Sequence, residues 1–323
     1  MPVVIGVAAG AAGLYKVYQA ISGNNMAESL NEKASSIVNS AENKLNKSRK
    51  NYQESLKQLG QKKANIIAKN VSNFITTYEQ INNVDFAENT LGDLTVNEFN
   101  EKTLEEMRKS VDFVLESGLN IGSGALVGAL TAFGAYNATV MFSAAGTGMA
   151  IESLGGAATA EFLGSSVISG IFGTGGTLAL GALTAGPALL AMGWYMESQA
   201  EKSLDEARSN HEKAKKYVSN ADAESITNER IKEVAIVAIS VLSNLAKHSR
   251  RATKKLADII AEQGTNYTEY NDKAKNIVLY NVKLMQLIKA TIEIDIVGEK
   301  GILLENAIIN LDKIKQDIQK ITV

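Results

Sequence analysis

Residues 117–151 read SGLNIGSGALVGALTAFGAYNATVMFSAAGTGMAI, and residues 162–196 read FLGSSVISGIFGTGGTLALGALTAGPALLAMGWYM. Each run is 35 residues long and contains no Asp, Glu, Lys or Arg; between the runs lie two carboxylates, Glu152 and Glu161. About 20 apolar residues cross a bilayer as a helix, so either run is long enough to span one. The flanking sequence is charged and typical of water-soluble helices. We therefore expect a hydrophobic hairpin inserted into a helical protein.

Composition indicates an all-α fold. The 323 residues are 45% hydrophobic and include only two prolines, and Ala, Glu, Lys, Leu and Ile are abundant, which favours helix. We expect an elongated bundle of long helices with the Gly- and Ala-rich hairpin at its centre; a short β-tongue between residues 170 and 186 is an alternative to helix there. The net charge of -2 gives no global attraction for nucleic acid, and the absence of cysteine excludes disulfides and thiolate chemistry.

Four segments are predicted along the chain: an apolar amino-terminal helix (1–22), the first part of the bundle (23–117), the hydrophobic section (118–196) and the second part of the bundle (197–323). Apolar residues recur at helical spacing from about residue 24 to 81, which predicts one long amphipathic helix. Thr95 and Glu98 form a capping box that would begin a helix running directly into the hydrophobic section. We expect this helix to pair as a stalk with the charged return arm, residues 197–217.

Three further helices are predicted in the second part of the bundle. Residues 234–246 are apolar around the whole circumference but too few to span a membrane, which favours a core helix. Residues 277–292 and 302–321 show helical periodicity and follow a turn at residues 264–272.

Residues 3–15 are uncharged, and Lys16 follows them, whereas a secretory signal carries its positive charge first. We expect no conventional cleaved signal there, and either a core helix or a membrane-associated one.

Glycine distinguishes the hydrophobic section from an ordinary core helix. It holds 17 of the 26 glycines, although each glycine costs a water-soluble helix up to about 1 kcal/mol relative to Ala. In lipid, small residues four apart let helix backbones approach closely, and Gly118 with Gly122 and Gly124 with Gly128 have this glycine-zipper spacing. Close helix packing is the expected purpose of these glycines.

The free energy of membrane insertion predicts that residues 119–142 enter a bilayer only under certain conditions. Residues 119–142 hold about eight strongly apolar side chains, each contributing roughly -0.3 to -0.6 kcal/mol to insertion, and two asparagines oppose them. The section is thus poised between burial in protein and burial in lipid, as suits a hairpin that a soluble form shields and a conformational change releases. The residues that we predict to insert are Gly118, Gly122, Gly124, Leu126, Gly128, Phe133, Phe142, Ile171, Phe172, Leu180, Leu183 and Trp194.

Glu152 and Glu161 bracket two glycines and so mark the expected hairpin tip. They either cross the membrane or line a polar lumen, because intramembrane carboxylates rarely face lipid, or they lie in a solvated turn. A competing explanation for the whole section is a glycine-rich hairpin that stays buried within an oligomer and never enters lipid.

One basic cluster stands out, and no catalytic motif does. Anionic lipid headgroups or nucleic acid could bind this cluster on one helix face, although a solvated face is the commoner meaning of such a run; its members are Lys247, Arg250, Arg251, Lys254 and Lys255. The sequence has no P-loop, nucleophile elbow or HExxH motif, and its two histidines lie on different predicted helices. We expect no enzyme, no cofactor and no metal site, and no nucleic-acid partner.

Long helices on both sides of a central uncharged hairpin resemble the α-helical pore-forming toxins, the group of cytolysin A, haemolysin BL and the non-haemolytic enterotoxin components. The resemblance is architectural and involves no short motif. It implies a soluble form that inserts residues 118–196 into a lipid membrane and assembles as a homo-oligomer, with companion components as a possibility. Export without a conventional signal and a cytoplasmic location both stay open, as does action on the membrane of the protein's own cell. The alternative function is a cytoplasmic helical scaffold or signalling partner that assembles through glycine-rich packing.

Overall fold

The computed structural model describes residues 25–86, 99–121, 126–136, 204–298 and 302–321. These residues form helices joined by turns, and they contain no strand beyond two isolated bridges. The prediction of an all-α helical bundle is therefore confirmed. The described chain divides into two compact units, one containing residues 25–52 and 204–230 and the other containing the rest. Most of the predicted hairpin, with any β-tongue, and the amino-terminal segment 1–22 lie outside the described residues.

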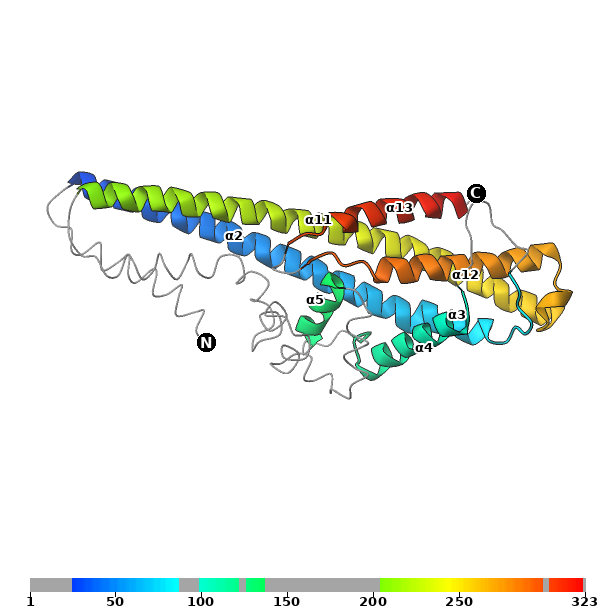
Figure 1. Cartoon of the computed structure of the whole chain (residues 1–323). Helices are drawn as coiled ribbons and strands as arrows, with labels where there is room; N and C mark the ends of the chain where they lie inside the picture. Colours follow the sequence, from blue (N-terminus) through cyan, green and yellow to red (C-terminus); the bar gives the residue numbers. More distant parts are fainter. Residues whose placement is uncertain (1–24, 87–98, 122–125, 137–203, 299–301, 322–323) are drawn as a thin grey trace. The chain divides into compact units, whose positions relative to one another are not determined.

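The predicted amphipathic helix of residues 24–81 is present as three consecutive elements (Figure 1). They are α2 (Asn25–Ile66), a π-helical turn η1 (Ile67–Val71) and α3 (Ser72–Tyr78). A π-turn within a helix inserts one residue and shifts the faces that follow. Here Asn70 is buried and donates to the carbonyl of Ala246 at 2.9 Å and to Ser249 Oγ at 3.4 Å, so the turn lies where a polar side chain meets a neighbouring helix.

In the first unit, α2 packs beside the start of α11 (Leu204–Gln263). The two helices run parallel, since Lys44 pairs with Asp222 and Ser48, further along α2, accepts a hydrogen bond from Asn228. Ala41, Leu45, Tyr217 and Ala221 form the apolar core of this contact. The return arm thus packs against α2, and the predicted stalk between this arm and the helix before the hydrophobic section is wrong. The reason is that buried residues such as Tyr217 give the arm an apolar face that matches α2.

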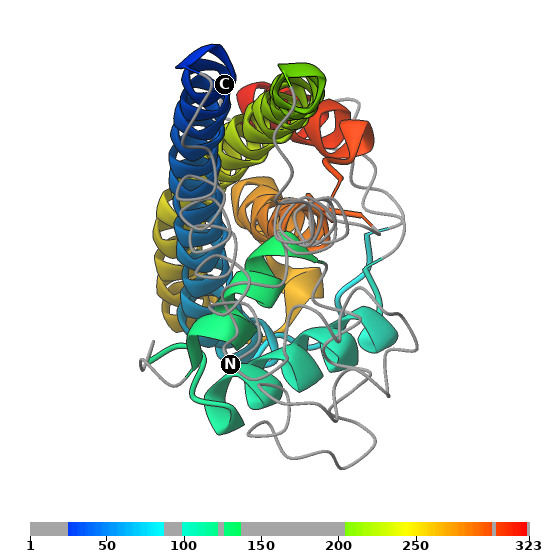
Figure 2. The same ribbon diagram turned by 90° about the vertical axis from the view of Figure 1, so that its left-hand side faces the viewer.

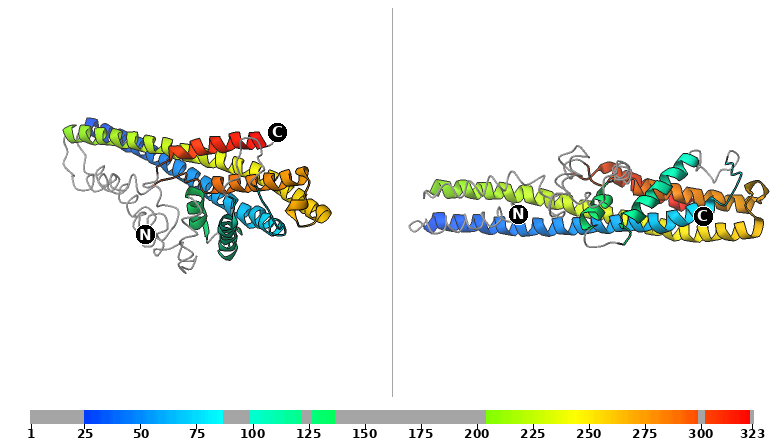
Figure 3. Two further views of the ribbon diagram at one scale, coloured as in Figure 1. Left: turned by 45° about the vertical axis from the view of Figure 1, so that its right-hand side comes forward. Right: turned by 90° about the horizontal axis from the view of Figure 1, so that it is seen from below.

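In the second unit, the rest of α11 packs against α12 (Asp272–Ile292), which returns antiparallel beside it (Figures 1 and 3). Helix α13 (Glu305–Ile321) contacts α12, so the two predicted carboxyl-terminal helices are present. Asn281 is fully buried; it donates to the carbonyls of Ala252 at 3.0 Å and Ile277 at 2.9 Å, and it accepts from Thr253 Oγ1 at 3.2 Å. Residues 234–246 belong to the single long helix α11 and are mostly buried, although Ile236 is 50% exposed.

The end of α11 is fixed to the segment after α3. Gly264 ends the helix with a φ of +79°, in the left-handed region that favours glycine. Asn82 N then donates to the carbonyl of Thr265, and the amide of Tyr267, at the start of η3 (Tyr267–Glu269), donates back to Asn82. The predicted turn at residues 264–272 is confirmed, and it brings two distant segments into register.

Helix α4 (Glu101–Glu116) begins later than predicted. Its amino-terminal cap is Asn100, whose side chain accepts from the amide of Thr103, whereas Thr95 and Glu98 lie outside the described residues. Phe99, just before the cap, packs edge-on against Phe74 and Tyr78 of α3. The prediction of a capping-box start through Phe99 is therefore wrong, because Asn100 caps the helix instead and leaves Phe99 free to pack against α3.

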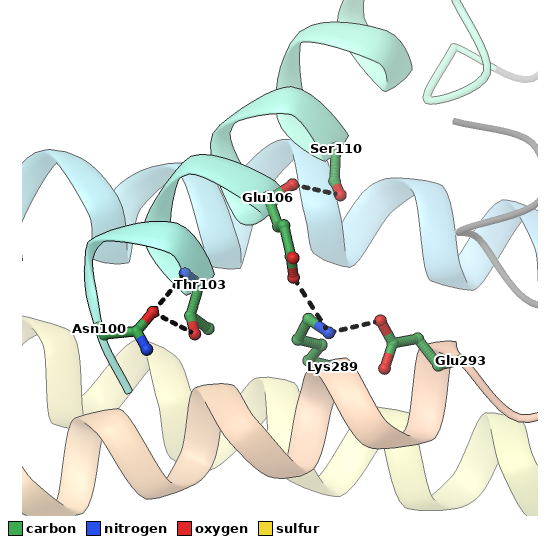
Figure 4. A network of polar contacts seen from close by, with 6 residues as sticks. All are labelled: Asn100, Thr103, Glu106, Ser110, Lys289 and Glu293. Atoms are coloured by element: carbon green, nitrogen blue, oxygen red, sulfur yellow. Dashed lines mark hydrogen bonds and ion pairs between the residues drawn. The ribbon is translucent and has the colours of Figure 1, made fainter. Parts of the chain in front are cut away.

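An ion-pair network joins α4 to α12 (Figure 4). Lys289 pairs with Glu293 at 2.6 Å and reaches Glu106 at 3.6 Å. Burial lowers the pKa of Lys289. The hydrogen bonds and charges of Glu293 and Glu106 raise it by more than burial lowers it, so the pKa lies above the ordinary value. Helix α12 thus lies between α4 and α13 (Figures 1 and 2), and in Figure 3 α4 crosses its neighbours obliquely.

Candidate functional site: the docking contact of helix α5

The hydrophobic section begins with a turn. Helix α4 ends at Glu116, and Gly118 has a φ of +67°, which redirects the chain. The prediction that this helix continues directly into the hydrophobic section is therefore wrong, since the left-handed glycine stops it. Leu119 is fully buried next to this turn, and Gln61 of α2 donates to the carbonyls of Leu119 and Asn120, both at 3.1 Å.

Helix α5 (Val127–Ala135) is the part of the first uncharged run that the structure describes as helix. It has no charged side chain, and each of its last seven residues is buried. Such a segment would expose a largely apolar surface if it left the protein, so the contact that holds it is the candidate functional site. Its neighbours come from the second half of α2 and from residues 293–298, between α12 and α13.

Two glycines bring the backbones of α2 and α5 together. A methyl group added at Gly60 would lie 1.9 Å from the carbonyl oxygen of Leu130, and one added at Gly134 would lie 1.8 Å from that of Leu56. These distances are far inside van der Waals contact, and each obstacle is backbone that cannot turn aside. The pairing of residue 60 with 130 and of 56 with 134 shows that the helices run antiparallel. Only glycine fits at positions 60 and 134 in this arrangement.

A buried lysine covers the carboxyl end of α5. Lys63 is 1% exposed, and its Nζ donates to the carbonyl of Tyr136 at 3.1 Å and lies 3.5 Å from that of Gly134. The same nitrogen lies 5.9 Å from the ring centre of Phe133. Burial lowers the pKa of Lys63 from 10.5 to about 7, and the charge of Asp295 opposes this shift only in part. The last carbonyls of a helix lack partners within the helix, and Lys63 supplies one.

Backbone hydrogen bonds complete the hold on α5. The carbonyl of Ala135 accepts from the amides of Ile296 at 2.8 Å and Val297 at 3.2 Å. Ile296 and Val297 are each 1% exposed, so these bonds are shielded from water. Three polar anchors therefore meet at the end of α5: the Lys63 amine and two backbone amides. They hold the chain at the point where it enters the rest of the hydrophobic section.

The predicted insertion residues fall into two groups. Gly118 lies in the turn, Leu126 is the amino-terminal cap residue of α5, Gly128 is half-buried in α5, and Phe133 is fully buried beside Lys63. The other predicted positions, including the proposed tip, lie outside the described residues: Gly122, Gly124, Phe142, Glu152, Glu161, Ile171, Phe172, Leu180, Leu183 and Trp194.

The predicted basic cluster lies on the exposed side of α11. All five of its members are exposed, whereas Ser249, Ala252 and Leu256, interspersed with them, are buried. Among the described residues, no ion pair joins any of the five to a carboxylate. The cluster is Lys247, Arg250, Arg251, Lys254 and Lys255.

The residues that hold α5, namely Gly60, Gln61 and Lys63, were not predicted from the sequence. A signal was present, because Lys63 follows Leu59 by four residues and precedes Ile66 by three, so it falls on the apolar face of α2. The run Gln61–Lys63 is nevertheless typical of an exposed polar stretch, so burial of Lys63 was not expected. Gly60 within a long helix is a second signal, since an interior glycine often marks a close approach.

Within the described parts of the chain, no group of carboxylates and histidines has the makings of a metal site. None of the helices described there is both long and apolar enough to cross a bilayer. Comparison with known protein families, with curated proteins and with solved structures gave no match to this chain.

Proposed function

We propose that this chain is a noncatalytic, membrane-active protein that shelters its hydrophobic section in a helical bundle and releases it into a bilayer. Insertion of residues 118–196, followed by oligomerisation, would form a pore or permeabilise the membrane. The observation that carries the proposal is the docking of α5: an uncharged helix at the start of the hydrophobic section, buried by contacts with α2 and residues 293–298. The architectural resemblance to the α-helical pore-forming toxins points in the same direction.

The contact with α2 suits a helix that must be released. It combines close backbone packing with a few polar anchors, one of them a lysine that is costly to bury. If α5 left this site, Lys63 would regain its hydration, while α5 would need another apolar environment. A bilayer offers that environment, and its interior tolerates the glycines that α5 uses for packing.

Dye release from liposomes tests the proposal. We expect the purified protein to release dye, and we expect Leu180→Lys to reduce the release by at least tenfold, because a lysine near the bilayer centre costs about 2.5 to 3.5 kcal/mol. Gln316→Lys, an exposed position on α13, adds the same charge and should leak like the parent protein. A parent protein that neither binds nor permeabilises vesicles would contradict the proposal. Full leakage by Leu180→Lys would show that residues 162–196 do not insert.

A second candidate function is a helical scaffold that assembles through glycine-rich packing. The Gly60–Gly134 contact favours it, since here glycines join two helices within the protein. The scaffold hypothesis predicts that Leu180→Lys abolishes self-association, measured by sedimentation, in a protein that never binds vesicles.

A further inference from the structure

The environment of Lys63 matches a neutral amine. A neutral amine has two N–H groups, and Lys63 Nζ has two carbonyl neighbours, those of Gly134 and Tyr136. An ammonium group has a third N–H. The Nζ also lies 5.9 Å from the centre of the Phe133 ring, and among the described residues no carboxylate lies within ion-pair distance of Lys63. The site therefore accommodates the uncharged side chain better than the charged one.

From this geometry we infer that α5 leaves its site on α2 with the uptake of one proton by Lys63. In the docked state above about pH 7, Lys63 Nζ is an uncharged amine whose two N–H groups face the carbonyls of Tyr136 at 3.1 Å and Gly134 at 3.5 Å. In the undocked state the amine enters water and takes a proton from it, becoming an ammonium ion. Lys63 is thus a proton-linked latch on the hydrophobic section.

The direction of the pH effect follows from the two protonation states. The docked pKa is about 7 and the ordinary value is 10.5, so between these values the undocked state holds one more proton. The undocking constant should therefore rise about tenfold for each unit that the pH falls within this window. Below about pH 7 both states are charged and the constant should level off. The hold on α5 is weakest at neutral and acidic pH and strongest in alkali.

Two other titratable groups act at this site. Asp295, in the segment between α12 and α13, raises the pKa of Lys63 through its charge, and α5 itself carries no charged side chain. Tyr136 follows α5, and burial, with the charge of Asp295, raises its pKa to about 12. The Tyr136 phenol therefore stays protonated across the window, and the slope belongs to Lys63.

Cysteine labelling measures the undocking directly, because the chain has no native cysteine. Thr131→Cys places a thiol on α5 at a residue that is 4% exposed. Its labelling rate is divided at each pH by the rate in urea-denatured protein, which removes the titration of the thiol. We expect this ratio to fall about a hundredfold from pH 7.5 to 9.5.

Variants at position 63 identify the group responsible. In the Thr131→Cys background, Lys63→Met and Lys63→Gln cannot take up the proton, and the ratio should not change with pH; Gln also keeps two N–H donors, in case Met impairs folding. Lys62→Met, a partly exposed neighbour, should retain the slope. A flat ratio with Lys63 present, or a slope that persists in either folded variant, would overturn the inference.

The role of the latch in membrane insertion rests on the proposed function, but this experiment contains no lipid. A pH-dependent labelling ratio in a protein that never permeabilises vesicles would support proton-linked undocking and contradict pore formation. Vesicle leakage with a labelling ratio that does not change with pH would support pore formation and contradict proton-linked undocking.

Discussion

At the scale of single residues, buried polar side chains specify how these helices meet. Asn70 bonds α11 from the π-turn, Asn281 bonds α11 from α12, and Lys63 bonds the end of α5. Apolar faces alone allow helices to slide and rotate, whereas a buried amide has to meet its partners or pay the cost of desolvation. These residues therefore fix register as well as contributing stability.

Asn281 offers a direct test of this role. We expect Asn281→Ala to lower the free energy of unfolding by about 2 kcal/mol, because it leaves the buried carbonyl of Ala252 and the hydroxyl of Thr253 without this partner. Urea denaturation followed by circular dichroism measures the change. Asn276→Ala, at an exposed position of the same helix, should change it by less than about 0.5 kcal/mol. Equal effects of the two substitutions would contradict the register role.

At the scale of elements, α5 differs from its neighbours. Helix α13 buries one face and exposes the other, while α5 is uncharged and buried along seven of its nine residues. Its stability therefore comes from the contacts with α2 and with the amides of Ile296 and Val297, since an isolated helix of nine residues is unstable in water. Because of this dependence, we expect α5 to dock or undock as a unit.

The close contact between α2 and α5 predicts an unusual result for a glycine substitution. In an ordinary helix Gly→Ala is stabilising by up to about 1 kcal/mol. Gly60→Ala should instead favour undocking and raise the labelling ratio of the Thr131→Cys protein, native over urea-denatured, at least tenfold. The reason is that its methyl group would meet the Leu130 carbonyl oxygen at 1.9 Å. In the control, Gln58→Ala, the substitution lies at an exposed position of the same helix, so the ratio should change little. An unchanged ratio in Gly60→Ala would refute the tight packing.

At the scale of the whole molecule, the net charge of -2 gives no attraction for an anionic surface, so any such attraction has to be local. The exposed cluster on α11 is the candidate for it. Each basic residue near an anionic bilayer contributes about 1 kcal/mol to binding. On the proposed function, five such residues would bring the protein to the membrane before the hydrophobic section is released.

Charge reversal tests this step. We expect Arg250→Glu with Arg251→Glu to weaken binding to vesicles containing anionic lipid by about 30-fold or more, measured by vesicle co-sedimentation at low salt. The control, Arg230→Glu with Lys273→Glu, changes two exposed basic residues elsewhere. Both double variants shift the net charge by the same amount, so only a local site distinguishes them. Equal weakening would mean that the cluster has no special role.

Much of the local structure was predictable from the sequence. Apolar periodicity predicts helix over about residues 24–81, 277–292 and 302–321, and the structure has helix over residues 25–78, 272–292 and 305–321. The break at Gly264 follows from the conformational freedom of glycine. The helix start at Asn100 was missed because Thr95 and Glu98 form an equally good capping pattern, and the choice between two caps depends on where Phe99 packs.

The sequence by itself determined the all-α class and the existence of an uncharged, glycine-rich section, because helix propensity and hydrophobic pattern are properties of neighbouring residues. Only the tertiary structure decided that the return arm pairs with α2, that Gly60 faces Gly134, and that Lys63 is buried at the end of α5. These facts depend on which faces of distant segments meet. A lysine on an apolar helix face can extend into water or be covered, and what covers Lys63 lies more than seventy residues away in the chain.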